Sequence, residues 1–130
     1  TFEAVLAGHP DANDARLGAG NACAALRRPA EAATHFTTLL QRDPAHVHAR
    51  FKLGNALLDL DRVTEAAAHY DAARRLSPAD AEIHHNLGIA FARTSRWDEA
   101  RQAFDEALRL RPDYTDARRS REQLRQVTGH

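Results

Sequence analysis

The sequence predicts an all-α fold, an array of antiparallel helix pairs, and three features predict it. Prolines recur at an interval of 34 residues, at Pro10, Pro44, Pro78 and Pro112. Small and aromatic residues keep the same interval: Gly20, Gly54 and Gly88; Ala32, Ala66 and Ala100; Phe36, Tyr70 and Phe104. A fixed period in this range is typical of arrays in which each helical unit packs on its neighbours. The third feature is a composition that favours closely packed helices.

That composition also argues against several classes of partner. The hydrophobic fraction is 43%, much of it alanine, while aromatic residues make up only 6%. Lys and Arg number 18, as do Asp and Glu, so the chain has no net field that would attract nucleic acid or an anionic membrane. No apolar run has the length of a membrane span. We expect a cytoplasmic protein with no nucleic acid and no membrane as a partner.

Between the prolines, each 34-residue unit divides into two amphipathic stretches. The predicted helix pairs cover residues 13–26 and 30–42, then 47–60 and 63–76, then 81–94 and 97–110. Pro44, Pro78 and Pro112 each end a helical pattern, because proline lacks the backbone N–H that a helix interior needs. A last helical pattern over 114–127 has a narrow apolar stripe and an otherwise polar surface, which suits a cap on the array.

The three glycines in register need a packing reason. A glycine inside a helix costs about 1 kcal/mol relative to alanine. We expect each glycine to let the two helices of a pair approach closely, with the alanine twelve residues later as the matching small surface. The aromatic residue that follows is expected to plug into the next pair.

The period also divides the chain into expected units. These are the second helix of a truncated preceding repeat over 1–12, three repeats over 13–46, 47–80 and 81–114, and a capping helix with a tail over 115–130. Phe2, Val5 and Leu6 would then lack a partner helix, and the chain contains no Met. We therefore expect a fragment of a longer protein.

The pattern resembles the tetratricopeptide repeat (TPR). The residues that carry the resemblance are Leu53, Gly54, Leu57, Ala66, Tyr70, Ala73 and Pro78, then Leu87, Gly88, Phe91, Ala100, Phe104, Ala107 and Pro112. The first unit fits less well, with Cys23 where a large residue is usual. Arg16, Arg50 and His84 stand where the family often has Trp. The resemblance implies a right-handed superhelix of three repeats plus a capping helix.

The resemblance also implies a concave groove lined by the first helix of each pair. Carried over by spacing, the residues expected to bind a peptide there are Leu17, Asn21, His48, Phe51, Lys52, Asn55, Leu58, Glu82, His85, Asn86, Ile89 and Arg119. The apolar members would form pockets, and the Asn amides would bond an extended peptide backbone, which offers a donor and an acceptor at each residue. The alternative is that the Asn side chains bond neighbouring helices.

One TPR subclass grips a C-terminal carboxylate with a clamp of Lys, Asn and Arg side chains. Asn55 and Asn86 match two of its positions. Phe51 stands where the clamp has Lys, and Asp116 and Ser120 replace its later cations. We therefore do not expect a full clamp.

No pattern indicates a catalytic centre, a metal site or a cofactor. His46, His48, His84 and His85 can approach one another across adjacent helices. No pair of them has the i, i+4 spacing that places two ligands on one helix face, and the single cysteine is Cys23. The sequence also lacks a glycine-rich phosphate loop and a nucleophile elbow. We expect solvated or groove-lining histidines.

These observations predict a non-catalytic scaffold that binds an extended segment of a protein or peptide in the concave groove. Two alternatives stay open. In the first, the chain is the substrate-recruiting arm of a larger enzyme of the glycosyltransferase or methyltransferase type. In the second, it self-assembles through the exposed N-terminal helix that contains Phe2, Val5 and Leu6.

Overall fold

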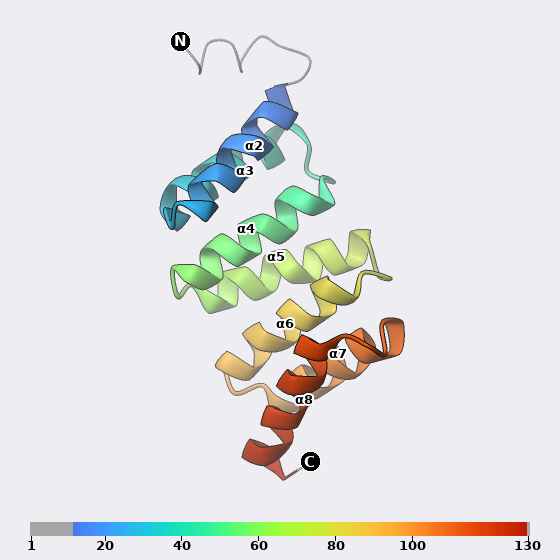
Figure 1. Ribbon diagram of the computed structural model, residues 1–130. Coiled ribbons are helices and arrows are strands. Elements are labelled where there is room, and N and C mark those ends of the chain that lie inside the picture. The colour runs from blue at the N-terminus through green and yellow to red at the C-terminus, as the bar shows by residue number, and fades with distance from the viewer. Residues whose placement is uncertain (1–11, 130) are drawn as a thin grey trace.

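The computed structural model describes residues 12–129, and this part of the chain is helical throughout apart from short turns (Figure 1). The helices are α2 (Ala12–Ala25), α3 (Pro29–Arg42), α4 (Val47–Asp59), α5 (Val63–Leu76), α6 (Ala81–Arg93), α7 (Trp97–Leu110) and α8 (Thr115–Thr128). Each end agrees with the prediction from the sequence to within one residue. Phe2, Val5 and Leu6, on which the self-assembly hypothesis rests, lie outside the described residues.

The helices form three antiparallel pairs, α2 with α3, α4 with α5 and α6 with α7, and α8 closes the array (Figure 1). Each helix packs on the helices before and after it. In addition α2 meets α4, α4 meets α6 and α6 meets α8, whereas α3, α5 and α7 make no such contacts with one another. The first helices are therefore closer together than the second helices. The stack curves toward a wall made of α2, α4, α6 and α8, which we call the inner wall.

A repeated turn joins the two helices of each pair. Arg27, Asp61 and Ser95 adopt left-handed backbone conformations with φ of 59°, 61° and 60°. The N–H of the next residue then bonds the carbonyl five residues earlier, as Arg62 N does to Leu57 O at 2.8 Å. This bond satisfies a carbonyl that the end of the first helix would otherwise leave open. The turn has the same geometry in all three pairs.

The three glycines accept an aromatic ring of their own helix pair. A Cβ atom added at Gly54 would lie 2.5 Å from the ring of Tyr70, and Gly20 and Gly88 have the same relation to Phe36 and Phe104. We expected the ring to plug into the next pair, but its closest fit is within the pair. A flat ring can reach the helix backbone only where no side chain intervenes, so the ring determines the need for glycine.

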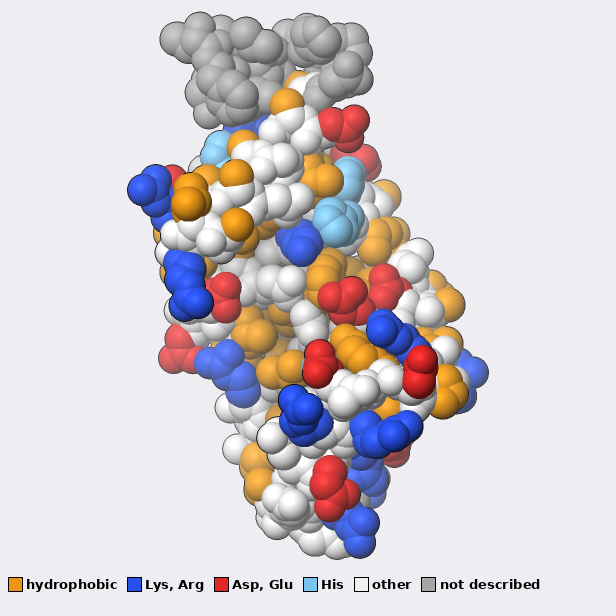
Figure 2. Space-filling model, in the orientation of Figure 1, with side chains coloured by type: hydrophobic (Ala, Val, Ile, Leu, Met, Phe, Trp, Pro, Cys, Tyr) orange, Lys and Arg blue, Asp and Glu red, His pale blue; other side chains and the backbone are white. Residues whose placement is uncertain are grey.

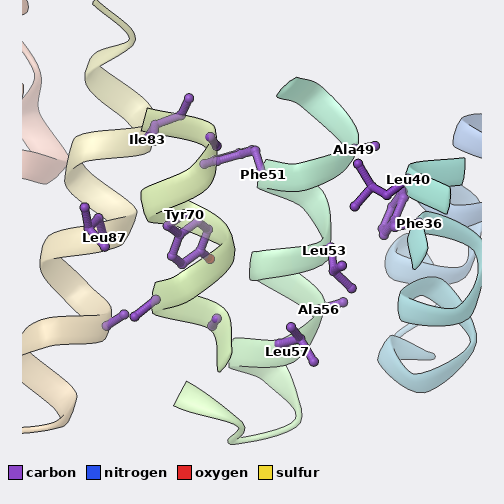
Figure 3. Close-up of a cluster of buried hydrophobic side chains, with 14 of the residues drawn as sticks. Phe36, Leu40, Ala49, Phe51, Leu53, Ala56, Leu57, Tyr70, Ile83 and Leu87 are labelled. Atoms are coloured by element: carbon purple, nitrogen blue, oxygen red, sulfur yellow. The ribbon is translucent and has the colours of Figure 1, made fainter. Parts of the chain in front are cut away.

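The largest hydrophobic cluster lies between the two layers of helices from α3 to α6 (Figure 3). Two smaller clusters lie toward α8. Phe36, Leu39 and Tyr70 are fully buried in the largest cluster. Leu53, Leu57 and Leu87 of the first helices fill the space between successive pairs. None of the helices between Ala12 and Thr128 is long and apolar enough to cross a membrane.

A polar tie stands at two of the positions that lack the expected tryptophan, Arg50 and His84, and at the equivalent Arg118 of α8. Arg50 Nη2 donates to the carbonyl of Pro44 at 2.8 Å, His84 Nε2 to that of Pro78 at 2.8 Å, and Arg118 Nη2 to that of Pro112 at 2.7 Å. Each tie joins the first turn of a helix to the repeating proline six residues earlier. The same 34-residue period that places the prolines also places these donors.

Helix α8 departs from the other first helices where a second helix would pack. Ala117 and Leu124 are buried against the last pair. Glu122 stands at the position of Gly20, Gly54 and Gly88 and is exposed. An aromatic ring cannot reach the backbone of α8 there as it does in the three pairs.

Candidate functional site

The inner wall carries the side chains that the sequence assigns to a binding groove, and residues 34 apart occupy equivalent places on its helices. His48, Glu82 and Arg119 are exposed. Leu17, Asn21, Lys52, Asn55, Leu58, Asn86 and Ile89 are half-buried. Figure 2 shows cationic, anionic and hydrophobic side chains interspersed over the face that α4, α6 and α8 present. The wall therefore offers mixed contacts and no extended field of one sign.

Two of the expected groove residues lie deeper than the rest. Phe51 and His85 occupy equivalent places on α4 and α6, and each is only 7% exposed. Phe51 extends from α4 toward α5, and its ring centroid lies 5.8 Å from that of Tyr70 (Figure 3). Both side chains thus lie beneath the surface of the inner wall and pack against residues behind it. Spacing along the helix predicted that these residues face the inner wall, but it could not predict how deeply their side chains are buried.

Two asparagines bond each other and so tie three helices together. Asn55 Oδ1 accepts a hydrogen bond from the Tyr70 hydroxyl at 2.5 Å and another from Asn86 Nδ2 at 2.9 Å. This is the alternative in which Asn side chains bond neighbouring helices. Burial raises the pKa of the Tyr70 hydroxyl far above its usual range, so it remains a donor. The network joins α4, α5 and α6.

The equivalent place in the first pair lacks this network. Asn21 is the counterpart of Asn55, while Phe36 replaces Tyr70 and Lys52 replaces Asn86. Asn21 Oδ1 is buried and has no hydrogen-bond partner among the described residues. A buried amide oxygen without a donor costs about 1–3 kcal/mol. This acceptor lies between α2 and α4 on the inner wall.

His85 joins α6 to the end of the array. Its Nε2 lies 2.9 Å from the Ser120 hydroxyl of α8, and its Nδ1 lies 3.3 Å from the Tyr114 hydroxyl. Its ring also packs edge-on against Tyr114, with 5.1 Å between centroids. Burial lowers the pKa of His85, and the charges of Asp116 and Glu82 oppose this only in part. The neutral ring therefore holds α8 in place.

Comparison with known proteins identifies the family. A family model described as the tetratricopeptide repeat matches residues 1–47, 24–81 and 51–115. The chain belongs to the tetratricopeptide repeat family. The three helix pairs and α8 fit three TPR units followed by a capping helix. No curated protein matches the sequence significantly.

Solved TPR structures share the fold over almost the whole chain. The crystal structure of MamA superposes with a TM-score of 0.91 at 20% identity, covering 98% of this chain and 75% of MamA. The first TPR of Spaghetti (RPAP3), bound to the HSP90 peptide SRMEEVD, gives 0.88 at 18% identity, covering 91% and 94%. YrrB, described as a TPR protein with an unusual peptide-binding site, gives 0.83 at 24% identity, covering 93% and 62%. At these identities the likeness establishes the fold alone.

Three histidines of this TPR array make local hydrogen bonds. His46 Nδ1 accepts a hydrogen bond from the backbone N–H of Ala49 at 3.1 Å and so caps α4. His84 donates to the Pro78 carbonyl. His85 lies within hydrogen-bonding distance of the hydroxyls of Tyr114, just before α8, and Ser120, within α8. Within residues 12–129, no three His, Cys, Asp or Glu side chains gather as a metal site would require.

His48 is the histidine that the inner wall exposes. Its pKa is lowered, first by partial burial and then by the nearby charges of Lys52 and His46. Glu82 and Asp80 act in the opposite direction. Its imidazole is therefore neutral at pH 7 and can both donate and accept a hydrogen bond.

The structure adds a pocket that sequence reasoning missed. It lies where α6, α7 and α8 meet, and we call it the α6–α8 pocket. Its volume is about 240 Å³, and its lining includes Ile89, Ala92, Trp97, Leu124 and Val127. Of these, only Ile89 was expected to contribute to binding. Trp97 and Val127 are 38% and 68% exposed, which is unusual for large apolar side chains in this structure.

Proposed function

We propose that this TPR array is a non-catalytic scaffold that binds an extended segment of a partner protein along its inner wall. The observation that carries the proposal is the contact of the first helices with one another, which the second helices lack. This curvature creates a concave surface on the side where half-buried apolar residues alternate with amides and charges. Such a surface suits a chain that presents backbone polar groups and side chains together.

Two of the structurally similar proteins support the same function. The TPR of Spaghetti is bound to a peptide of HSP90, and YrrB is described as having a peptide-binding site. Their folds superpose on almost all of this chain, which supports a peptide-binding role here. The mixed charges of the inner wall here favour a segment that combines apolar and charged residues.

The exposed and half-buried members of the predicted site would make the contacts. Lys52, His48 and Glu82 present charge or hydrogen-bonding groups to the solvent side of the wall. Leu58 and Ile89 present apolar surface between them. Asn21 would contribute through the rest of its half-buried side chain, because its amide oxygen is enclosed by protein atoms. Phe51 and His85 would act indirectly, by holding the wall in shape.

A peptide library tests the proposal directly. Random peptides displayed on phage are selected on the immobilised protein, and the enriched peptide is titrated by calorimetry. Reversing the inner-wall charge in Lys52→Glu should change the affinity by about tenfold, because a rim charge pair contributes up to about 1 kcal/mol and a like charge repels. The matched control is Thr37→Glu, an exposed residue of α3 on the opposite layer. Equal effects of the two variants, or no enriched peptide, would contradict the proposal.

The same surface would serve the substrate-recruiting arm of a larger enzyme. That alternative concerns the longer protein, and the full reading frame decides it. A catalytic domain encoded next to this array would support it.

A further inference from the structure

We propose that the α6–α8 pocket anchors one large aliphatic side chain of the bound segment, beside which the segment carries a carboxylate that pairs with Arg93. This inference rests on the peptide-binding function proposed above and specifies where the affinity comes from. It names the partner by its chemistry, an acidic segment with a single bulky apolar residue. The argument runs from the origin of the pocket to its size and its charge.

The pocket exists because the polar network of the preceding pair is replaced by shorter and apolar side chains. Between α4 and α6, the bonded Asn55, Tyr70 and Asn86 fill the equivalent space. One period later these positions hold Ile89, Phe104 and Ser120, which all contact the pocket. The network is gone, and an apolar hollow takes its place.

A second replacement empties the space further. Leu58 packs against the core at its place on α4, but the equivalent residue on α6 is Ala92. The missing atoms of the leucine side chain leave room on the inner wall next to Ile89. Leu124 and Val127 of α8 form the opposite side, and Trp97 of α7 closes the end. Each of the three helices therefore contributes apolar surface, beside the polar Ser120 and Gln123 of α8 and the charged Arg93 of α6.

The size of the pocket matches a single side chain. Its volume of about 240 Å³ is below the roughly 300–1,000 Å³ typical of sites for small molecules and cofactors. An extended segment needs only one side chain to enter while its backbone runs across the wall. The pocket opens to solvent, and covering its apolar lining favours a branched aliphatic group such as that of leucine.

The charge at the opening of the α6–α8 pocket favours particular ligand residues beside the apolar side chain that enters it. Arg93 is the one charged side chain that lines the pocket, within the described chain. Its Nη2 lies 3.0 Å from Asp61 Oδ1, and the two side chains are 43% and 83% exposed. An ion pair this exposed is weak, so a carboxylate of the ligand can replace Asp61. The pocket is thus complementary to an apolar side chain with a neighbouring acidic residue.

The only tryptophan of the chain is Trp97, so its fluorescence reports occupation of the pocket. Three synthetic pentapeptides serve as probes: a central leucine flanked by glutamates, the same peptide with alanine at the centre, and leucine flanked by lysines. The first should shift Trp97 emission in a saturable manner. The other two should bind about tenfold more weakly or worse, since each lacks one of the two contacts.

Variants then assign the effect to the pocket. Ala92→Leu installs the side chain that α4 has at this place and should weaken the leucine peptide about tenfold by filling the hollow. Arg93→Gln should remove the preference for glutamate over lysine flanks. The matched control is Ala24→Leu, which makes the same change in the same row on α2, where the side chain is exposed. Circular dichroism checks that all variants keep the helical fold.

The possible failures are distinguishable. If the glutamate–leucine peptide leaves Trp97 emission and the NMR signals of α6 and α8 unchanged up to millimolar concentration, the inference is overturned. It is also overturned if the peptide binds equally well to the Ala92→Leu variant. In either case a phage-selected peptide that responds to Lys52→Glu would leave the proposed function standing. Failure of both experiments would overturn both proposals.

Discussion

At the scale of single residues, two glycines in α2 have opposite surroundings. Gly20 lies under the ring of Phe36, and an added Cβ would meet that ring at 2.5 Å. Gly18 has no atom within 4 Å of the same construction. The first glycine is required by packing, whereas the second only makes the helix more flexible.

Alanine substitutions should therefore change stability in opposite directions. Gly20→Ala is expected to destabilise the protein by about 1–3 kcal/mol, because the ring must move. Gly18→Ala should stabilise it by about 0.5–1 kcal/mol, the helix propensity of alanine over glycine. Urea denaturation followed by circular dichroism measures both free energies of unfolding. A stabilising Gly20→Ala would show that the ring contact does not require glycine.

The buried His85 gives the protein a pH dependence with a definite sign. Burial lowers its pKa in the folded state below the ordinary value of 6.5. As the pH falls below about 6.5, the unfolded chain takes up a proton that the folded protein does not. Stability is therefore fully present above that pH and is lost as the pH falls toward the pKa of the folded state.

The variant His85→Phe isolates this contribution, because Phe51 is the natural residue at the equivalent place on α4. Its loss of stability between pH 7 and pH 5 should be smaller than that of the wild type, as judged by thermal unfolding at each pH. His48 and His69 also have lowered pKa values, but they are present in both proteins and cancel. Parallel curves for the two proteins would contradict the assignment to His85.

At the scale of secondary-structure elements, the ties to the proline carbonyls hold the first turns of α4, α6 and α8. Arg118 holds the start of α8 by its bond to Pro112, and α8 has no side-chain cap at Tyr114. A helix end that depends on one such bond should fray when it is removed. The tie is thus a feature of the element, although one side chain makes it.

Replacing Arg118 by leucine should increase hydrogen exchange at the amides of the second turn of α8, since those of the first turn lack helical hydrogen bonds. A charge-assisted hydrogen bond contributes about 1.5–3 kcal/mol, so exchange there should become about tenfold faster or more. Arg119→Leu is the control, since the adjacent side chain is exposed on the inner wall. Unchanged exchange in α8 of the Arg118 variant would show that packing of Ala117 and Leu124 alone places the helix.

The positions of the helices were predictable because the signals that start and end a helix are local in the sequence. Prolines, glycines and apolar spacing specify where each helix begins and ends, and all seven helices within residues 12–129 agree with the pattern. The depth of Phe51 and His85 was not predictable, since it depends on rings supplied by other helices, Tyr70 and Tyr114. The spacing of residues along one helix does not show which side chains of other elements pack against them.

The asparagine network was one of two alternatives that the sequence left open, and the α6–α8 pocket was missed, for a related reason. The network forms because the Tyr70 hydroxyl and the Asn86 amide, which come from two other helices, both donate to Asn55 Oδ1. The pocket arises from side chains that are too short, such as Ala92 in the place of Leu58. A comparison of residues 34 apart would have indicated both features. The polar Asn55 and Tyr70 of the second pair correspond to the apolar Ile89 and Phe104 of the third.

At the scale of the whole molecule, stability should be highest in the middle of the stack. Helices α4, α5 and α6 have packed neighbours on both sides, whereas α8 packs mainly on α7. In an array of this kind each unit is stabilised by its own packing and by its interfaces with adjacent units.

Native-state hydrogen exchange should therefore show a gradient of protection along the chain. The amides of α4 to α6 should exchange through global unfolding, and those of α8 through local opening of lower free energy. Adding denaturant distinguishes the two, because local opening exposes little surface and responds weakly. Equal protection of all helices would indicate one cooperative unit without end effects.

The turn within each pair carries a conformational cost that is multiplied by the number of units. Arg27, Asp61 and Ser95 all hold a left-handed backbone, which costs a residue with a side chain about 1–2 kcal/mol. Glycine at this position would recover about half of that, after its greater freedom in the unfolded chain is counted. A lengthened array assembled from copies of this unit would therefore gain heat resistance with every added copy, by one substitution in the turn that joins the two helices.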